Sequence, residues 1–301
     1  MPDRISDALT AARDLSQDAA RDAMRAIYLP LLKAQPRTGF TIQMDVAYGP
    51  HERHKLDVHV PTTRSSKPIP VVLFFFGGGF VRGHKNELGE LVYGNVADFF
   101  ARNGMIGINA NYRLADQAQW PGGGEDVGAA VAWTCANIAK YGGDPERIFI
   151  MGHSSGATHV ATYALRRELH PAGGPGIAGA MALSGNYLLN RDNPDPNHLS
   201  YYGKDVENWD SRALIPAAHW GDFALFLSTA EFEPFPFNRS FAAMVSALAE
   251  KSGRMPRIAF FTGHNHSSEQ MAIGTGDRVI ESALLDFVRE ASAQKGSERQ
   301  S

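Results

Sequence analysis

Short apolar runs alternate with segments of helical period from Phe40 to the end of the chain. This alternation constrains the fold most, because it is typical of a mostly parallel sheet covered by helices on both faces. Runs that are apolar throughout, such as Pro70 to Phe76, indicate central strands buried on both sides. The sequence predicts eight strands, at residues 41–47, 54–60, 70–76, 105–110, 148–151, 177–183, 223–228 and 257–261.

The first two predicted strands are separated by a turn that contains Gly49 and Pro50. We therefore expect an antiparallel hairpin at one edge of the sheet. Helical patterns at residues 126–140, 158–167, 238–251 and 278–293 supply the covering layers.

The predicted organisation is one α/β domain, residues 40–301, after an N-terminal helical segment, residues 1–39. Apolar residues make up 44% of the chain and charged residues 20%, as in ordinary globular proteins. From Asn186 to His219 neither the strand nor the helix period is present. Long irregular segments inside a domain are often lids or binding loops, so we expect a cap or loop insertion at about residues 186–219.

The net charge and the N-terminal residues argue against several classes of partner and location. A formal net charge of -3 lacks the positive field that nucleic acid or an anionic membrane surface would require. Residues Met1 to Ala26 mix charges with alanines and predict an amphipathic helix, without the apolar core of a signal peptide. No spanning segment is predicted, and a single cysteine, Cys135, forms no internal disulfide, so a cytoplasmic protein is expected.

The pentapeptide Gly152 to Gly156 has the form G-x-S-x-G and stands between an apolar strand and a helical run. In that context the glycines allow a sharp, strained turn, because side chains at their positions would collide with neighbouring backbone. The turn exposes Ser154 at the carboxyl end of its strand. The sequence therefore predicts Ser154 as a nucleophile.

Three consecutive glycines, Gly77 to Gly79, follow the strand that ends at Phe76. A tetrahedral oxyanion needs converging N–H donors, and glycine backbone can approach a substrate closely. The position upstream of Ser154 is where the oxyanion loop belongs in a fold of this type. We expect this loop to bind the developing negative charge.

Taken together and in order, seven short motifs make a resemblance plain. The chain resembles the α/β-hydrolase carboxylesterases of the hormone-sensitive lipase type, and also the kynurenine formamidases and feruloyl esterases. The matching motifs are Phe76 to Phe80, Asn111 to Leu114, Trp120-Pro121, Tyr141 to Arg147, Gly152 to Gly156, Glu231 to Pro234 and Gly263 to His266.

The resemblance implies the α/β-hydrolase fold and a serine carboxylic ester hydrolase that needs no cofactor. It also implies backbone oxyanion donors at Gly78, Gly79 and Ser155. The chain departs from the family's usual pattern at two positions. Phe76 replaces a histidine that braces the glycine loop, and Glu233-Pro234 replaces an Asp-Pro pair.

The general base must follow the acid in the chain order of this fold, and both His264 and His266 follow the last strand. The resemblance identifies His266 as the base and leaves His264 to brace the loop. A metal site at the two histidines lacks a carboxylate or cysteine set, so no metal is predicted. Glu231 and Glu233 both suit the acid by position. Proline fixes the backbone of the residue before it, which favours Glu233.

Aromatic side chains near these motifs predict an apolar or aromatic pocket for a small ester with a short or aromatic acyl group. Its predicted substrate-binding residues are Phe80, His153, Tyr187, Tyr201, Tyr202 and Phe235. The alternatives are an arylformamidase or other amide hydrolase of the same fold, and a ligand-binding relative without catalysis. The sequence leaves the physiological substrate and a possible homodimer open.

Overall fold

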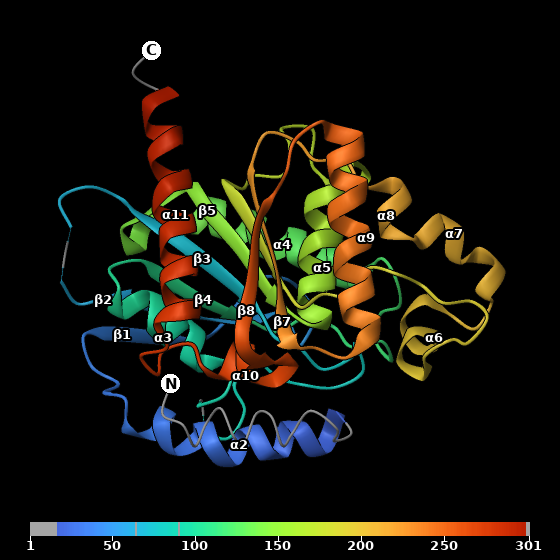
Figure 1. Cartoon of the computed structure of the whole chain (residues 1–301). Helices are drawn as coiled ribbons and strands as arrows, with labels where there is room; N and C mark the ends of the chain where they lie inside the picture. The colour runs from blue at the N-terminus through green and yellow to red at the C-terminus, as the bar shows by residue number, and fades with distance from the viewer. Residues whose placement is uncertain (1–16, 64, 90, 299–301) are drawn as a thin grey trace.

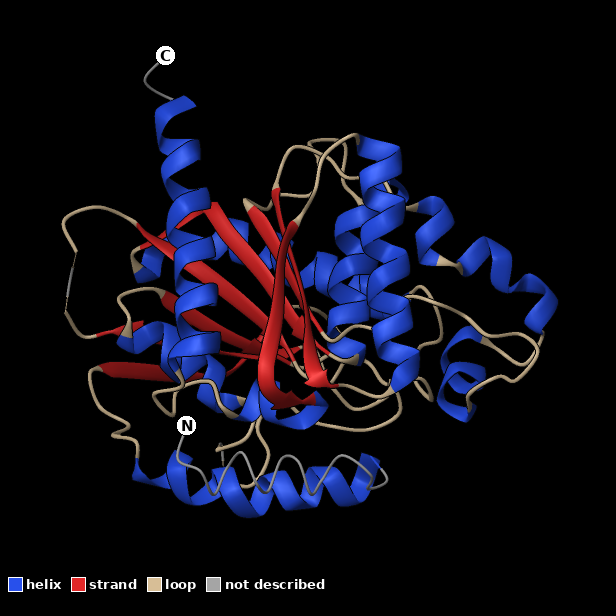
Figure 2. Cartoon of the chain, viewed as in Figure 1, coloured by secondary structure: helices blue, strands red, loops and turns tan. Residues whose placement is uncertain are grey.

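Eight strands form one sheet in the computed structural model, which describes residues 17–63, 65–89 and 91–298. Helices cover both faces of the sheet, as Figure 2 shows, so the predicted fold class is confirmed. The strands are β1 (Phe40–Ala47), β2 (Lys55–Pro61), β3 (Ile69–Phe75), β4 (Ile106–Ala110), β5 (Gly143–His153), β6 (Gly179–Leu183), β7 (Ala224–Phe232) and β8 (Arg257–Asn265).

The spatial order of the strands is β1-β2-β4-β3-β5-β6-β7-β8. β1 pairs with β2 and β2 with β4 in antiparallel fashion, and the remaining neighbours are parallel. The predicted hairpin at one edge is thus confirmed. Residues Val71 to Phe75 of β3 are at most 1% exposed, which explains why this strand is apolar throughout.

The helices form two layers. α3 and α11 cover one face, while α4, α5 and α9 cover the other (Figure 1). The longer helices are α2 (Gln17–Ala34), α3 (Gly94–Arg102), α4 (Gly122–Asn137), α5 (Ser155–Leu165), α9 (Phe235–Ser252) and α11 (Arg278–Glu298). The shorter ones are α6 (Pro196–Tyr202), α7 (Trp209–Arg212), α8 (Leu214–Ala217) and α10 (His266–Met271), with 3₁₀ turns η2 (Ile138–Tyr141), η3 (Arg167–Leu169) and η4 (Val206–Asn208).

The insertion at residues 186–219 is more regular than the sequence indicated. It contains α6, η4, α7 and α8, none longer than seven residues. Helices this short complete at most two turns, so no apolar period develops from which to predict them. α3, with nine residues, is likewise not among the predicted helices.

α4 begins at Gly122, four residues before the predicted start. Glycines usually weaken a helix, but here they allow close packing on α5. A Cβ on Gly123 would lie 2.2 Å from the His159 ring, and one on Gly124 would meet Thr162 at 3.1 Å. Tertiary packing therefore overrides the local preference.

α2 lies across the carboxyl ends of the strands and packs against α10 (Figure 1). Its buried residues Met24 and Tyr28 join the core of the α/β domain. Within the described chain, the amphipathic helix predicted for residues 1–26 is present from Gln17 onward and extends to Ala34. Residues 1–16 lie outside the described part.

Within the described ranges, no helix combines the length and the apolar character needed to cross a membrane.

Candidate active site

Ser154 lies on a sharp turn between β5 and α5. Its backbone has a φ of 56° and a ψ of -123°, a positive φ that non-glycine residues rarely adopt. A Cβ on Gly152 would lie 2.3 Å from the carbonyl oxygen of Gly156, and one on Gly156 would lie 2.2 Å from that of Phe75. The predicted collisions are therefore real, and both glycines are required for the turn.

His266 is the first residue of α10, directly after β8. The Asn265 side chain accepts hydrogen bonds from the amides of Ser267 and Ser268, which caps the helix and fixes its start. The Nε2 atom of His266 lies 2.9 Å from Ser154 Oγ, and its Nδ1 atom is hydrogen-bonded to Glu233 Oε1. A serine, an imidazole and a carboxylate are thus connected in one line.

Glu233 directly follows β7, which runs four residues farther than predicted. Its side chain is buried, and its Oε2 atom accepts a hydrogen bond from Ser184 Oγ at 2.9 Å. Glu231 is instead exposed, and its carboxylate accepts from the Gly263 amide at 2.7 Å. The two glutamates diverge because the register between β7 and β8 shifts after Ala230. Glu233 is the one that contacts His266.

The Glu233 carboxylate determines the charge state of His266. Burial alone would lower the pKa of the imidazole, but the charge and hydrogen bond of Glu233, with a smaller contribution from Glu269, raise the pKa above its ordinary value. Glu233 accepts the Nδ1 proton, which leaves Nε2 able to accept a proton from Ser154. The arrangement therefore supports general-base chemistry at Ser154.

The glycine loop Gly77 to Gly79 lies beside the serine. A Cβ on Gly77 would be 3.0 Å from Ser154 Cβ, and one on Gly78 would be 1.9 Å from the carbonyl oxygen of Arg82. Both Gly78 and Gly79 line the same cleft as Ser154. Ser155 begins α5, where first-turn amides have no acceptor within the helix. All three predicted oxyanion donors thus line the same cleft as the serine.

Phe76 does not leave the glycine loop unsupported. Its ring is buried and stacks on Tyr112 with the centroids 4.4 Å apart. The Tyr112 hydroxyl donates to the Phe76 carbonyl at 3.0 Å, and the Tyr93 hydroxyl donates to the Gly77 carbonyl at 3.2 Å. Two tyrosines therefore brace the loop from which the family's usual histidine is missing.

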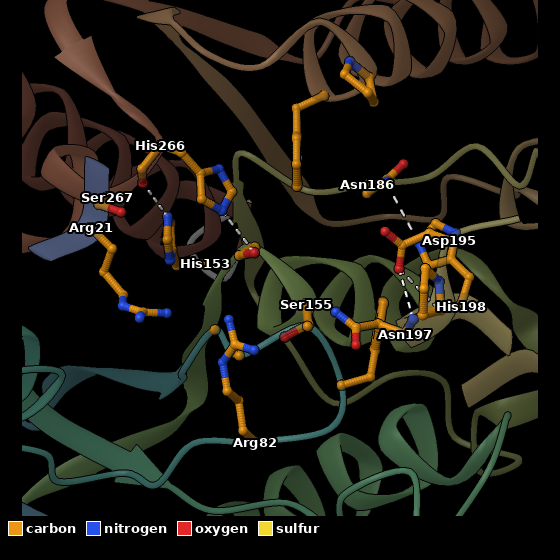
Figure 3. A pocket seen from close by; sticks show the side chains of 18 of the residues that line it. Arg21, Arg82, His153, Ser155, Asn186, Asp195, Asn197, His198, His266 and Ser267 are labelled. Carbon is orange, nitrogen blue, oxygen red and sulfur yellow. Dashed lines mark hydrogen bonds between the residues drawn. The ribbon is translucent and has the colours of Figure 1, made fainter. Parts of the chain in front are cut away.

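His153 lies beside His266, with ring centroids 4.8 Å apart, and both are seen at one end of the cleft in Figure 3. Burial, helped by the neighbouring imidazole, lowers the pKa of His153 to about 3, so this ring is neutral. Its Nε2 atom lies 2.7 Å from the His266 carbonyl oxygen, and because a carbonyl can only accept, Nε2 carries the proton of the neutral ring and donates it. His153 lines the cleft as predicted, and it also anchors the backbone of His266.

A cleft of about 1190 Å³ opens at the carboxyl ends of the strands. Of the predicted substrate-binding aromatics, Phe80 and Phe235 line it. Tyr187, Tyr201 and Tyr202 do not, and each is at most 3% exposed, so their direct contact with substrate is a wrong prediction. Buried aromatic rings in a loop pack against one another instead of facing the cleft.

Tyr201 and Tyr202 belong to a small core under the insertion. Tyr201 stacks on Phe80 with centroids 4.7 Å apart, and Trp209 packs in the same cluster. The cleft itself is bordered by residues 188–198, the first part of the insertion. The insertion therefore contributes its polar first half to the cleft and its aromatic second half to packing.

Charged residues that the sequence did not indicate also line the cleft. Arg21 and Arg25 come from α2, and Arg82 follows the glycine loop. Figure 3 shows Arg21 and Arg82 directed toward the cleft from different elements. Their approach depends on how α2 packs across the sheet, so no local motif could have identified them. The lining is mixed, in contrast to the predicted apolar or aromatic pocket.

Two more residues that the sequence did not predict are Ser184 and Glu269, which are connected to Glu233 on the side away from His266. Ser184 directly follows β6 and contacts both Glu233 and Glu269 through its hydroxyl. Glu269 is fully buried on α10, three residues after His266. Its spacing from His266 is the only sequence signal, and it identifies Glu269 only once His266 is known to begin a helix.

His264 is buried and does not reach the serine. It lies in β8, not in a loop after the strand as predicted, and its Nδ1 atom lies 3.2 Å from Ser268 Oγ and its Nε2 atom 3.3 Å from Asp277, so it joins the end of β8 to α10 and to the residue before α11. In the part of the chain that the structure describes, no three His, Cys, Asp or Glu side chains gather in a way that could hold a metal ion.

Comparison with known proteins is consistent with this geometry. A family model described as BD-FAE matches residues 56–171. A rice protein (Oryza sativa subsp. japonica) named probable isoprenylcysteine alpha-carbonyl methylesterase ICMEL1 is 31% identical over 84% of this chain and 53% of its own length. Esterase LipQ of Mycobacterium tuberculosis is 26% identical over 94% of this chain and 71% of its own length. The chain spans about half the length of the plant relatives that it matches.

Solved structures share the fold. Esterase B from Lactobacillus rhamnosis superposes with a TM-score of 0.72 at 16% identity, covering 100% of this chain and 99% of its own. A hyperthermophilic esterase from Pyrobaculum calidifontis gives a TM-score of 0.70 at 17% identity, covering 98% of both chains. The chain therefore has the α/β-hydrolase fold of these esterases, and the relatives that it resembles in sequence carry esterase names.

Proposed function

We propose that this chain is a serine carboxylesterase that hydrolyses small esters through an acyl-enzyme intermediate. The observation that carries the proposal is the continuous hydrogen-bonded line from Ser154 through His266 to Glu233. The activity named for the related sequences supports the same reaction.

In the proposed first half-reaction, Ser154 Oγ attacks the ester carbonyl and His266 Nε2 takes the serine proton. The amides of Gly78, Gly79 and Ser155 stabilise the oxyanion that forms. His266 then donates its proton to the departing alkoxide, which leaves as the alcohol. The acyl group remains bonded to Ser154.

In the second half-reaction, water attacks the acyl-enzyme while His266 takes one of its protons. Collapse of the tetrahedral intermediate returns that proton to Ser154 and releases the carboxylic acid. The Glu233 carboxylate orients the imidazole throughout. Every proton and oxygen in the cycle comes from ester, water or protein, so the proposed reaction uses no cofactor.

A covalent-labelling experiment tests the enzyme proposal. A fluorophosphonate should label wild-type protein at Ser154, and peptide mapping should find the adduct there. Ser154→Ala is the matched control and should remain unlabelled. A protein that only binds a ligand should not react, so absence of labelling in the wild type would overturn the proposal.

Rates on a panel of substrates define which class of ester or amide the protein hydrolyses. We expect p-nitrophenyl esters with acyl groups of about two to six carbons to be hydrolysed faster than a palmitoyl ester, because the described insertion offers only short helices over the cleft. The panel should include a feruloyl ester, N-formylkynurenine and a prenylcysteine methyl ester, the last because of the rice relative's name. Preference for N-formylkynurenine would identify the arylformamidase alternative.

Self-association is a separate prediction. β8 forms one edge of the sheet, and Ile258 and Phe260 on it are 41% and 57% exposed. An apolar edge of this kind can pair with a second copy. Light scattering should find a dimer for the wild type and a monomer for Phe260→Lys, whereas a monomeric wild type would refute the prediction.

A further inference from the structure

Glu269 is a second buried carboxyl behind the acid of the site. It lies on α10, one turn after His266, and its side chain has no exposed surface. Ser184 stands between the two glutamates: its Oγ atom lies 2.9 Å from Glu233 Oε2 and is hydrogen-bonded to Glu269 Oε2. The other Glu269 oxygen accepts from Ser228 Oγ at 2.5 Å. All four polar side chains are buried.

The number of protons in this cluster determines which groups are ionised. A serine hydroxyl carries one proton and can donate to only one carboxyl at a time. For both Ser184 contacts to be hydrogen bonds, one carboxyl must itself donate. Glu233 faces Nδ1 of His266, whereas burial and the nearby Glu233 carboxylate raise the pKa of Glu269, so the donating carboxylic acid is Glu269. The Glu269 O–H donates to Ser184, and the Ser184 O–H donates to Glu233.

The backbone conformation of Ser184 places its hydroxyl between the carboxyl groups of Glu233 and Glu269. Its backbone φ is 48°, a conformation that serine rarely adopts, and its amide donates to the Ser228 carbonyl at 3.1 Å. Strained residues of this kind persist where surrounding contacts hold them, often at functional sites. The bend at the end of β6 therefore places the hydroxyl between the two carboxyls.

The surroundings of Glu269 favour its neutral form. Burial, followed by the negative charge of Glu233, raises the pKa of Glu269 to about 7, against the hydrogen bonds that Ser184 and Ser228 could donate to the ionised carboxylate. The ionisable groups that interact with it are Glu233 after β7, His266 on its own helix and Tyr187 after β6. α2 also packs against α10, and its Arg21 and Arg25 line the cleft.

We propose that Glu269 is a positioning residue: as a neutral acid it fixes Glu233 through Ser184, and its ionisation sets the pH at which His266 becomes an effective base. This rests on the proposed serine esterase function. When Glu269 loses its proton, a second negative charge forms near His266 and favours the protonated imidazole. Loss of the Glu269 charge should therefore make His266 a working base at lower pH.

Two substitutions at one position separate geometry from charge. Glu269→Gln has the same shape, and its amide can donate to Ser184 and accept from Ser228, so it imitates the neutral acid permanently. We expect it to keep at least about a third of wild-type kcat at the pH optimum, because the positioning hydrogen bonds survive. Glu269→Ala removes them and should lower kcat by about tenfold or more.

The pH profile supplies a readout that packing alone would not change. The acid limb of kcat/KM for Glu269→Gln should move to lower pH than in the wild type, by about half a unit or more. Glu281→Gln is the matched control. The Glu281 carboxyl is only partly buried, and its pKa is raised as that of Glu269 is. It accepts hydrogen bonds from the amides of Gly274 and Gly276 and not from groups of the active site. Its acid limb should coincide with that of the wild type.

A double-mutant cycle tests whether Ser184 transmits the effect. If Glu269 acts through this hydroxyl, Ser184→Ala and Ser184→Ala/Glu269→Ala should lose activity to about the same extent. Losses that multiply independently would show that Glu269 acts by packing alone and would overturn the proposal. So would a Glu269→Gln variant that folds normally but is as inactive as Glu269→Ala.

The titration of His266 itself gives a test without substrate. Nitrogen NMR of the imidazole should find a lower pKa for His266 in Glu269→Gln than in the wild type, and an unchanged value in Glu281→Gln. Equal values in wild type and Glu269→Gln would overturn the proposal. If no ester is hydrolysed and Ser154 resists phosphonate, the serine esterase proposal fails, while this titration still decides the role of Glu269.

Discussion

The Nε2 atom of His266 lies 2.9 Å from Ser154 Oγ, although the two residues are 112 positions apart in the chain. Each stands at the carboxyl end of a parallel strand, β5 for the serine and β8 for the histidine. Parallel strands bring such ends to one edge of the sheet, where ligands gather in open α/β folds. The parallel sheet therefore brings Ser154 and His266 together.

Replacing the serine tests the centre of the site. Ser154→Ala should lower ester hydrolysis by several powers of ten, because the nucleophile is lost. Thermal unfolding should change little, since the hydroxyl lines the cleft and is not part of the core. Retention of more than about a tenth of wild-type turnover, in a preparation free of other esterases, would refute the role of Ser154.

Replacing the two glutamates at the end of β7 should change activity to very different extents. Glu233→Gln replaces a carboxylate that holds His266 and should lower kcat by orders of magnitude, because the imidazole loses its orientation. Glu231→Gln is the matched variant, exposed and bonded to the Gly263 amide and not to His266, and should keep most activity. The measurement is kcat on one activated ester. The reverse ranking would assign the acid to Glu231.

The pH dependence follows from the direction of the His266 pKa. His266 must be neutral to act as a base, and its pKa is raised above the ordinary value of about 6.5. Activity should therefore be lost on acidification at a pH above about 6.5. A kcat/KM profile from pH 5 to 9 measures this midpoint. A midpoint near 5.5 would mean that burial outweighs the Glu233 charge.

Glu269 should also make stability depend on pH. Its folded-state pKa of about 7 exceeds the 4.5 of an ordinary glutamate, so the folded chain binds this proton more tightly than the unfolded chain. The resulting stabilisation is fully present below pH 4.5 and is lost as pH rises through about 7. Glu269→Gln lacks this contribution.

Urea unfolding of wild type and Glu269→Gln at pH 4.5, 6 and 8 compares the two free energies of unfolding. The wild-type value should fall relative to the variant by on the order of 3 kcal/mol at most, at about 1.4 kcal/mol per pKa unit. Other carboxyls are common to both proteins and cancel. A difference that stays constant with pH would show that Glu269 titrates normally in the fold.

Two aromatic residues near the cleft should respond differently. Tyr201→Ala removes a ring that is 2% exposed and should cost about 3 to 5 kcal/mol of stability. Phe235→Ala removes a ring that is 75% exposed at the cleft, so it should change KM or substrate preference with little change in Tm. Thermal unfolding measures Tm for both variants, and steady-state kinetics measures their KM. A change only in KM for Tyr201→Ala would restore its predicted contact with substrate.

Much of the framework is determined by local sequence. The continuous apolar run before Gly77 predicts a doubly buried strand, and G-x-S-x-G between strand and helix predicts the strained turn at Ser154. These features depend on backbone geometry within a few residues, so they can be recognised without knowledge of the rest of the chain.

The tertiary structure decides what depends on residues far apart. Only the packed sheet shows that Glu233 and not Glu231 faces His266, that Tyr201 packs under Phe80, and that Ser184 joins Glu269 to the site. Arg21 likewise reaches the cleft because α2 packs across the strand ends. Such contacts arise from long-range packing and shared burial, and no periodicity along the chain encodes them.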